Sequence, residues 1–142
     1  MNSPKKPGLK KSKSQSVSAL KKKADKYFSE YVRKRDADKN GIVTCITCSA
    51  KMPWKQSQAG HFVKRSVSLL RFDHFNVNGQ CMQCNVWKYG EQFAYSKALD
   101  LKYGDGTADR LFAQRFTSHK FTPDELLNII KEAKEEIALY DY

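Results

Sequence analysis

The sequence predicts an α+β fold, in which a small core of short strands and one helix is flanked by helices at both ends of the chain. Apolar residues near both ends recur at three- and four-residue steps, which is the helical period. The middle of the chain consists of short segments of mixed polarity that contain glycines, a pattern typical of short strands. Four cysteines, the only ones in the chain, form two Cys-x-x-Cys pairs around this middle, at 45/48 and 81/84. The 142 residues suffice for one domain and a tail.

The N-terminal part divides into a tail and a helix. Residues 1–18 are Lys, Ser, Pro and Gly with almost nothing to bury, so we expect a disordered basic tail. Such a tail either contacts phosphates or is simply solvated, and the sequence leaves both interpretations open. From 19 to 38 an apolar face formed by Leu20, Ala24, Phe28 and Val32 predicts a helix, which ends at the turn Asp38-Lys39-Asn40-Gly41.

Residues 19–142 are predicted to form a single domain whose core spans 42–103. Within the core we expect strands at 52–63 and 71–81 and a helix from Cys84 to about Lys102. Helices follow within 107–140. The last of them has a clear start signal, with Thr122 as N-cap, Pro123 in the first turn and Glu125 three residues after the cap, where it completes a capping box.

The cysteine pairs indicate a metal site. Two Cys-x-x-Cys pairs supply the four thiolates of a tetrahedral zinc site, and we assign Cys45, Cys48, Cys81 and Cys84 as ligands of a structural Zn²⁺. The start of the chain lacks the apolar segment of a signal peptide, and no apolar stretch is long enough to span a bilayer. We therefore expect a cytoplasmic protein without membrane contact, in which metal binding is favoured over two disulfides.

The charge of the chain indicates a polyanionic partner. The net charge is +11, and nine Lys against one Asp in residues 1–26 contribute +8. Residues 27–121 still carry 15 basic and 8 acidic side chains, so the excess is not confined to the tail. A basic globular region favours nucleic acid as the partner, and the alternative is that the charge serves solubility alone.

The order of elements resembles the ββα-metal (HNH, or His-Me finger) nuclease motif. In that motif a His on the first strand is the general base, an Asn before the second strand holds the catalytic loop, and a His or Asn at the helix start binds a divalent metal. His61, Asn76 and Asn85 occupy these places. The string Cys81-x-x-Cys84-Asn85 also resembles phage endonuclease VII, which has a zinc-stapled site of the same type.

A closer resemblance is to the bacteriophage NinG/Rap recombination endonucleases. It rests on Ala59-Gly60-His61-Phe62, Arg71-Phe72-Asp73, Asn76-Val77 and Gln80-Cys81-x-x-Cys84-Asn85-x-x-Lys88-x-Gly90, and it covers roughly residues 20–139. The resemblance implies an endodeoxyribonuclease that cuts branched DNA, such as Holliday junctions or D-loops, with Mg²⁺ or Mn²⁺. It also implies the cytoplasm of a host cell.

The residue types suit phosphodiester hydrolysis. A neutral imidazole such as His61 can deprotonate water near physiological pH, and a divalent ion can polarise the phosphate and stabilise the leaving alkoxide. Many ββα nucleases have a further metal ligand just before the base, where this chain has Gly60. Asp73 is the candidate to join Asn85 as a ligand of the catalytic metal, although Asp73 is equally a surface acid paired with Arg71. His74 is either a ligand or a packing or solvent-exposed residue.

The predicted DNA contacts are the basic residues nearest to this site in the sequence: Lys64, Arg65, Arg71 and Lys88. Each of them is alternatively an ordinary solvated charge. Trp54, Trp87 and Tyr89 either stack on exposed bases or pack beside the zinc.

Two other functions remain open at this stage. One is an HNH-type nuclease that cuts duplex DNA, and the other is a zinc-stabilised DNA-binding module without catalysis. Symmetric cutting of a junction also makes a homodimer attractive. The exposed-looking faces of the first and last helices either form that dimer or pack on each other.

Overall fold

The computed structural model describes residues 15–142, so most of the predicted tail lies outside the described residues. The described part contains four α-helices, two short antiparallel pairs of strands and three short helical turns. In chain order these elements are α1 (Val17–Arg35), β1 (Ile42–Thr44), β2 (Lys51–Pro53), η1 (Trp54–Gln56), β3 (Gln58–His61), η2 (Ser68–Leu70), β4 (Val77–Gln80), η3 (Gln83–Trp87), α2 (Gln92–Tyr103), α3 (Thr107–Ala113) and α4 (Pro123–Ile137).

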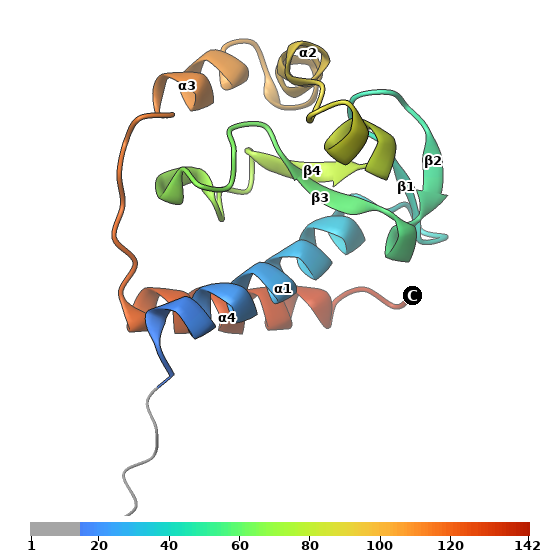
Figure 1. Cartoon of the computed structure of the whole chain (residues 1–142). Helices are drawn as coiled ribbons and strands as arrows, with labels where there is room; N and C mark the ends of the chain where they lie inside the picture. Colours follow the sequence, from blue (N-terminus) through green and yellow to red (C-terminus); the bar gives the residue numbers. More distant parts are fainter. Residues whose placement is uncertain (1–14) are drawn as a thin grey trace, which may run out of the picture.

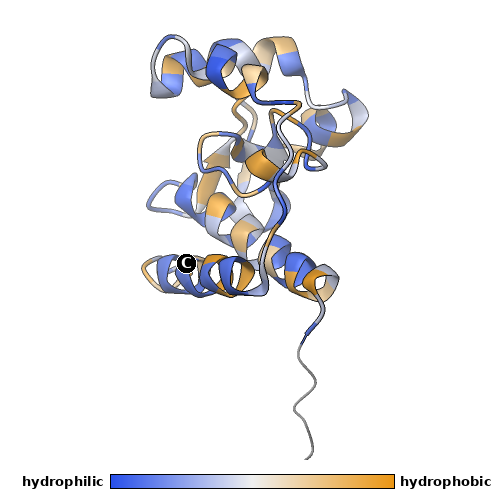
Figure 2. Ribbon diagram, turned by 90° about the vertical axis from the view of Figure 1, so that its left-hand side faces the viewer, coloured by the Kyte–Doolittle hydropathy of each residue, from blue (hydrophilic) through white to orange (hydrophobic). Residues whose placement is uncertain are grey.

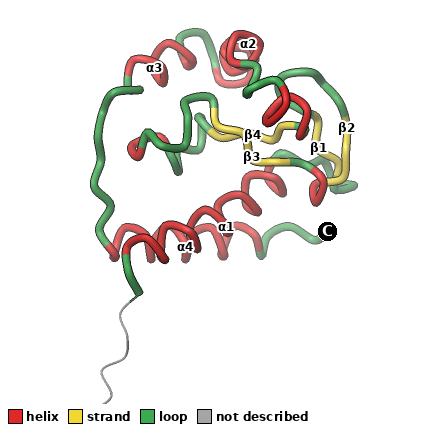
Figure 3. Tube along the Cα trace, in the orientation of Figure 1, coloured by secondary structure: helices red, strands yellow, loops and turns green. Residues whose placement is uncertain are grey.

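The elements form three layers (Figure 1). Helices α1 and α4 lie side by side below the antiparallel pair β3–β4, and α2 and α3 lie above it. The register of this pair runs from Gln58 opposite Gln80 to His61 opposite Val77. The other pair, β1–β2, is a separate ribbon at one end of the domain, as the short strand segments in Figure 3 show. The α+β class is therefore confirmed.

Helix α1 closely follows the prediction from its apolar face. Its first turn is capped by Ser16, whose hydroxyl accepts a hydrogen bond from the amide of Ala19 at 3.1 Å. Basic side chains in the last turn complement the helix dipole. The carboxylate of Asp38 accepts from the amides of Asn40 and Ile42, so the predicted turn forms, although the helix already ends at Arg35.

Helix α4 packs along α1, as one of the two alternatives for these helices predicted. Both helices are amphipathic, with hydrophobic and hydrophilic positions interspersed (Figure 2). Their hydrophobic positions meet in one buried cluster of Leu20, Ala24, Phe121, Leu126 and Ile130. The two faces therefore pack on each other within one chain.

The predicted N-cap of α4 is confirmed, while the capping box is only half formed. The hydroxyl of Thr122 accepts from the amide of Glu125 at 3.2 Å. The Glu125 carboxylate does not close the box but pairs with His119 Nε2 at 2.7 Å. Glu125 thus ties the start of α4 to the segment that precedes it.

A second core joins the central strands to the upper helices. Phe62, Val63, Leu70, Tyr95, Leu99, Ala108 and Leu111 form this cluster. The hydroxyl of the fully buried Tyr95 donates to the backbone oxygen of Gly60 at 2.7 Å, so α2 is hydrogen-bonded directly to β3.

Two predicted elements need correction. The strands are shorter than 52–63 and 71–81, because only 58–61 and 77–80 pair in the central ladder. The helix predicted from Cys84 to about Lys102 is divided into the π-helical turn η3 and the helix α2. Tyr89, Gly90 and Glu91 between them have φ values of 53°, 90° and 51°. Successive left-handed residues cannot continue a right-handed helix, so the chain changes direction here.

Between residues 15 and 142, no helix is both long and apolar enough to cross a membrane.

Candidate functional site

The four cysteines come together at the end of the central strands. Their Sγ atoms all lie within 4.8 Å of one another, and those of Cys48 and Cys81 are 3.7 Å apart. Tetrahedral zinc with Zn–S bonds of about 2.3 Å requires sulfurs about 3.8 Å apart, so the cluster can hold one zinc ion. All four are free thiols, and the sulfurs are too far apart for a disulfide of about 2.05 Å.

Hydrogen bonds connect this cluster to strand β4. The hydroxyl of Thr47 lies 3.3 Å from Cys45 Sγ and accepts from Gln80 Nε2 at 3.1 Å. The amide of Ile46 donates to the backbone oxygen of Gly79 at 3.0 Å. Such contacts around a ligand set orient it, so the cluster connects the turn after β1 to the turn that follows β4.

A cavity of about 380 Å³ lies beside the cluster, between α1, β3 and η3. It is lined by five of the residues predicted to act on DNA, which are His61, Lys64, Arg65, Arg71 and Asn85. Its remaining lining includes Asp25 from α1, which the sequence interpretation did not select. The fold therefore brings the predicted base and the predicted metal ligand to one place.

His61 has one ring nitrogen occupied by the protein. Its Nε2 lies 2.9 Å from the backbone oxygen of Arg71, and because a carbonyl only accepts, this nitrogen carries the proton in the neutral ring. The Nδ1 atom then holds the free lone pair. Burial lowers the pKa of His61 below its usual value near 6.5, against the smaller opposing effect of this hydrogen bond. The imidazole is thus neutral at pH 7, as a general base requires.

Asn76 is fully buried and does not line the cavity. Its Oδ1 accepts from the amide of Val63 at 2.8 Å, and its Nδ2 donates to the backbone oxygens of Val63 and Leu70 at 2.9 and 3.0 Å. These bonds hold both ends of the loop that carries Lys64 and Arg65. Asn76 therefore positions this loop, and its role in catalysis stays a prediction.

Asn85 reaches the cavity from the π-helical turn. Its Nδ2 donates to Gln58 Oε1 at 2.7 Å, which fixes the orientation of the amide and leaves Oδ1 as the oxygen available to a ligand. Wide turns of this kind occur often at functional sites, and here the turn contains both Asn85 and Cys84 of the cysteine cluster.

The structure does not bring Asp73 and His74 to this cavity. Both line another cavity of about 290 Å³. Asp73 Oδ1 accepts from the amides of Phe75 and Asn76, at 2.9 and 3.1 Å, which is the role of a turn residue. The ring of His74 packs edge-on against Phe28 and Tyr31. The predicted pairing of Asp73 with Asn85 therefore needs correction, and Arg71 does not pair with Asp73 either.

The absence of a metal-ligating side chain at position 60, just before His61, has a steric explanation. A Cβ atom on Gly60 would lie 1.8 Å from Oε1 of Gln80. The Gln80 side chain is fully buried and cannot move freely, because its Nε2 also donates to the backbone oxygen of Gly90 at 3.0 Å. The space that a side chain at position 60 would need is thus filled by Gln80 of β4, which is hydrogen-bonded to Thr47 and Gly90.

Asp25 is the site residue that sequence reasoning missed. Its carboxylate accepts from Nε of Arg71 at 2.9 Å and lies 3.8 Å from a guanidinium nitrogen of Arg65. One signal was available in the sequence, since Asp25 shares a helical face with the apolar Phe28 and Val32. An acid on an apolar face needs a partner, but nothing in the sequence identifies the partner as Arg71.

The residues predicted to contact DNA differ in solvent exposure and in whether another residue already pairs with them. Lys64 is exposed at the cavity, and the side chain of Arg65 is 62% exposed. Arg71 is only 17% exposed and is engaged with Asp25. Lys88 is exposed but does not line the cavity.

The three aromatic residues predicted to stack or pack also differ. The ring of Trp54 is covered by the Lys34 ammonium group at 4.8 Å, so Trp54 packs within the protein. Trp87 and Tyr89 are exposed, and Tyr89 lines the cavity.

The fold and the site define a small α+β protein with a four-cysteine cluster beside a cavity that holds His61, Asn85 and basic side chains. The chain belongs to the family described as Bacteriophage Lambda NinG protein, which matches residues 4–141.

Individual relatives agree with this membership. Protein ninG of Salmonella phage P22 is 28% identical over 117 residues, which is 82% of this chain and 55% of that protein. Protein ninG of Escherichia phage 933W is 30% identical over 105 residues, which is 73% of this chain and 49% of that protein. Protein ninG of Escherichia phage lambda is 27% identical over 117 residues, with shares of 82% and 54%. The chain thus spans about half the length of these curated relatives. No solved structure matches it.

Proposed function

We propose that this protein is a metal-dependent DNA endonuclease that cuts branched recombination intermediates, such as Holliday junctions and D-loops. One observation carries the proposal: a neutral histidine, an amide side chain able to bind a cation and several cationic side chains, all from residues 61–85, line one cavity. Phosphodiester hydrolysis needs these three kinds of group together, namely a base for water, an oxygen ligand for a cation and positive charge for the phosphate. The resemblance to the recombination endonucleases supports branched DNA as the substrate.

In this mechanism His61 takes the proton of the attacking water on Nδ1, while Nε2 stays bound to the backbone oxygen of Arg71. Lys64 and Arg65 hold the phosphates on either side of the cut. Asn76 keeps their loop against β4, so that base and cations retain their geometry. Zinc in the cysteine cluster acts structurally, since its four thiolates leave no open position for substrate.

The cavity offers few protein ligands to a catalytic Mg²⁺ or Mn²⁺. Among residues 15–142 the cysteines are the one group of three or more His, Cys, Asp or Glu side chains gathered closely enough for an ion, so the cavity has no full protein shell. Mg²⁺ usually takes few protein ligands and completes its shell with substrate phosphates and water. Oδ1 of Asn85 fits that role. The ion would polarise the phosphate and stabilise the leaving alkoxide.

Cleavage assays on substrates of the same sequence test the proposal. With Mg²⁺ or Mn²⁺, the purified protein should cut a four-way junction and a D-loop faster than the linear duplex. His61→Ala should lower the rate by about 10²- to 10⁴-fold, the usual contribution of a general base. Its matched control is His74→Ala, an exposed histidine in another cavity, which should cut like the parent.

Each other outcome contradicts the proposal in a distinct way. Equal cutting by His61→Ala and the parent would exclude the mechanism. Faster cutting of linear duplex would favour an HNH-type nuclease for duplex DNA. Junction binding without cleavage in any divalent metal would favour a DNA-binding module without catalysis. Light scattering would give the mass of the protein bound to a junction, and so show whether it binds as the homodimer that two symmetric cuts favour.

A further inference from the structure

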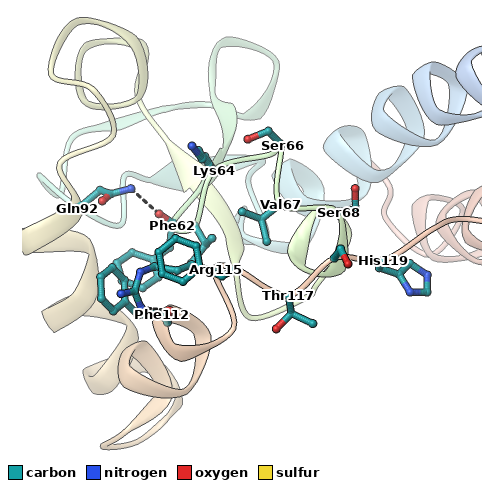
Figure 4. Close-up of a pocket in the computed structure, with 13 residues that line it drawn as sticks. Phe62, Lys64, Ser66, Val67, Ser68, Gln92, Phe112, Arg115, Thr117 and His119 are labelled. Carbon is teal, nitrogen blue, oxygen red and sulfur yellow. Dashed lines mark hydrogen bonds between the residues drawn. The ribbon is translucent and has the colours of Figure 1, made fainter.

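A second and larger cavity, of about 500 Å³, opens next to the 380 Å³ cavity that holds His61. Its walls are the loop after β3 and the segment that leaves α3, as Figure 4 shows for Lys64, Ser66 and Val67 on one side and Phe112, Arg115 and Thr117 on the other. Lys64 and Gln92 line both cavities. We call the second cavity the Arg115 pocket. A DNA strand whose phosphate lies at Lys64 therefore has a neighbouring nucleotide within reach of this pocket.

One wall of the Arg115 pocket consists of two exposed phenylalanine rings that both contact the guanidinium group of Arg115. The guanidinium carbon of Arg115 lies 3.8 Å from the ring centroid of Phe112 and 4.4 Å from that of Phe116. Phe116 is 85% exposed and Phe112 is 49% exposed, although each has a ring large enough to dominate a core. An exposed aromatic pair with a planar cation contributes little to folding. Such a pair is, however, the surface on which nucleobases stack.

The remaining lining suits the polar edge of a base and the backbone beside it. The hydroxyls of Ser66, Ser68, Thr117 and Ser118 supply both donors and acceptors around the opening. Lys64 and Arg115 contribute positive charge, and the volume lies within the range of small-ligand sites. Phe62 and Val67 line the interior, where an apolar ring face is favoured.

We propose that the Arg115 pocket binds one unpaired nucleobase of the DNA next to the phosphate that is cut. This rests on the proposed function and deepens it, because it explains how a small protein prefers branched DNA. In a duplex the bases are stacked and paired, and swinging one out costs a few kcal/mol. In a D-loop the displaced strand is already unpaired, and base pairs at the branch point of a junction open more easily than pairs inside a duplex, so a base enters the pocket at lower cost. The preference then comes from the availability of a base and needs no contact specific to its identity.

Fluorescence of 2-aminopurine, a base analogue that is quenched when it stacks, tests this pocket. The analogue is placed one nucleotide from the branch point of a four-way junction, and in the same sequence in a linear duplex. His61→Ala protein is used so that the DNA stays intact. The junction should change fluorescence on binding and the duplex should not. In the same background, Phe116→Ala and Arg115→Ala should each remove this change and weaken junction binding by about 5- to 150-fold, the usual effect of losing one stacked base.

The matched control is Phe93→Ala. Phe93 is an exposed phenylalanine with the Lys97 ammonium 4.4 Å from its ring centroid, but it lines neither cavity. It should retain both the fluorescence change and the affinity. Circular dichroism of the Phe116 variant should match the parent, because its ring is almost fully exposed.

The outcomes separate the two proposals. If Phe116→Ala and Arg115→Ala keep the fluorescence change, or if linear duplex shows the same change, the base pocket is refuted, whatever the cleavage assays show. If the parent cuts no DNA while the change appears on the junction and is lost in Phe116→Ala, the pocket stands and the nuclease proposal fails.

Discussion

The Nε2 atom of His61 lies 2.9 Å from the backbone oxygen of Arg71, and the guanidinium group of that arginine is paired with Asp25 on α1. The ring is therefore oriented by a backbone atom of a residue whose own side chain is anchored to another layer of the fold. Any change that moves the loop around Arg71 should alter His61 as well.

The pH profile of cleavage should have an acid limb below pH 6.5. Because burial lowers the pKa of His61, the ring stays neutral below its usual value, and the rate falls only as pH drops through the lowered pKa. Asp25 opposes that shift and Arg65 adds to it. Asp25→Asn should thus move the limb to lower pH and Arg65→Ala to higher pH, as measured from log rate against pH.

The same shift predicts a change in stability. Below pH 6.5 the unfolded chain binds a proton at His61 before the folded chain does, so the free energy of unfolding should decrease as pH falls from 6.5 through the lowered pKa. This part of the pH dependence should disappear in His61→Gln. A cleavage limb above pH 6.5, or movement of both variants in one direction, would contradict the assignment of His61 as the base.

The cysteine cluster should contain one zinc ion per chain and should stabilise the fold. Cys84→Ser removes one thiolate from a buried position, so zinc content by mass spectrometry should fall close to zero and unfolding should become easier by about 4 kcal/mol or more. Met82→Ser, at the exposed residue between Cys81 and Cys84, serves as the control. Full retention of zinc in Cys84→Ser would exclude the four-cysteine site. Co²⁺ in place of zinc should show the absorption of tetrahedral thiolate coordination.

Gly60→Ala should destabilise the protein through Gln80. The added methyl group would meet Oε1 of Gln80, whose side chain is held by hydrogen bonds from its Nε2 to Thr47 and Gly90. Overpacking of this kind costs about 1–3 kcal/mol in urea denaturation. The double variant with Gln80→Ala removes the clash, so its cost should be less than the sum of the single costs. Strictly additive costs would show that the two side chains do not conflict.

Asp25→Asn should strengthen DNA binding. The carboxylate neutralises Arg71 and lies near Arg65, so its removal frees positive charge at the cavity. In the uncut His61→Ala background, fluorescence anisotropy should show tighter binding at low salt, with a salt slope steeper by about one phosphate contact. Glu135→Gln makes the same charge change at an exposed position on α4 and should have little effect. Weaker binding in Asp25→Asn would instead show that the ion pair shapes the DNA site.

Features that depend on neighbours in the sequence were predictable from the chain alone. The apolar face of α1, the Thr122 cap of α4 and the spacing of the cysteine pairs each follow from contacts within a few residues. The resemblance placed His61 and Asn85 together, and the structure puts both in one cavity.

Other features depend on segments that are distant along the chain, and only the tertiary structure decided them. Asp25 meets Arg71 because α1 crosses under the central strands. Gly60 lies close to the side chain of Gln80 because the register of β3 and β4 pairs Gly60 with Asn78 and so places Gln80 diagonally across from it. The break at Tyr89–Glu91 also depends on packing, since the apolar spacing of 84–102 continues through it. Local sequence determines which helix faces are apolar and where a helix is capped. Long-range packing determines which residue pairs with a buried charge such as Asp25, and why position 60 has no room for a side chain.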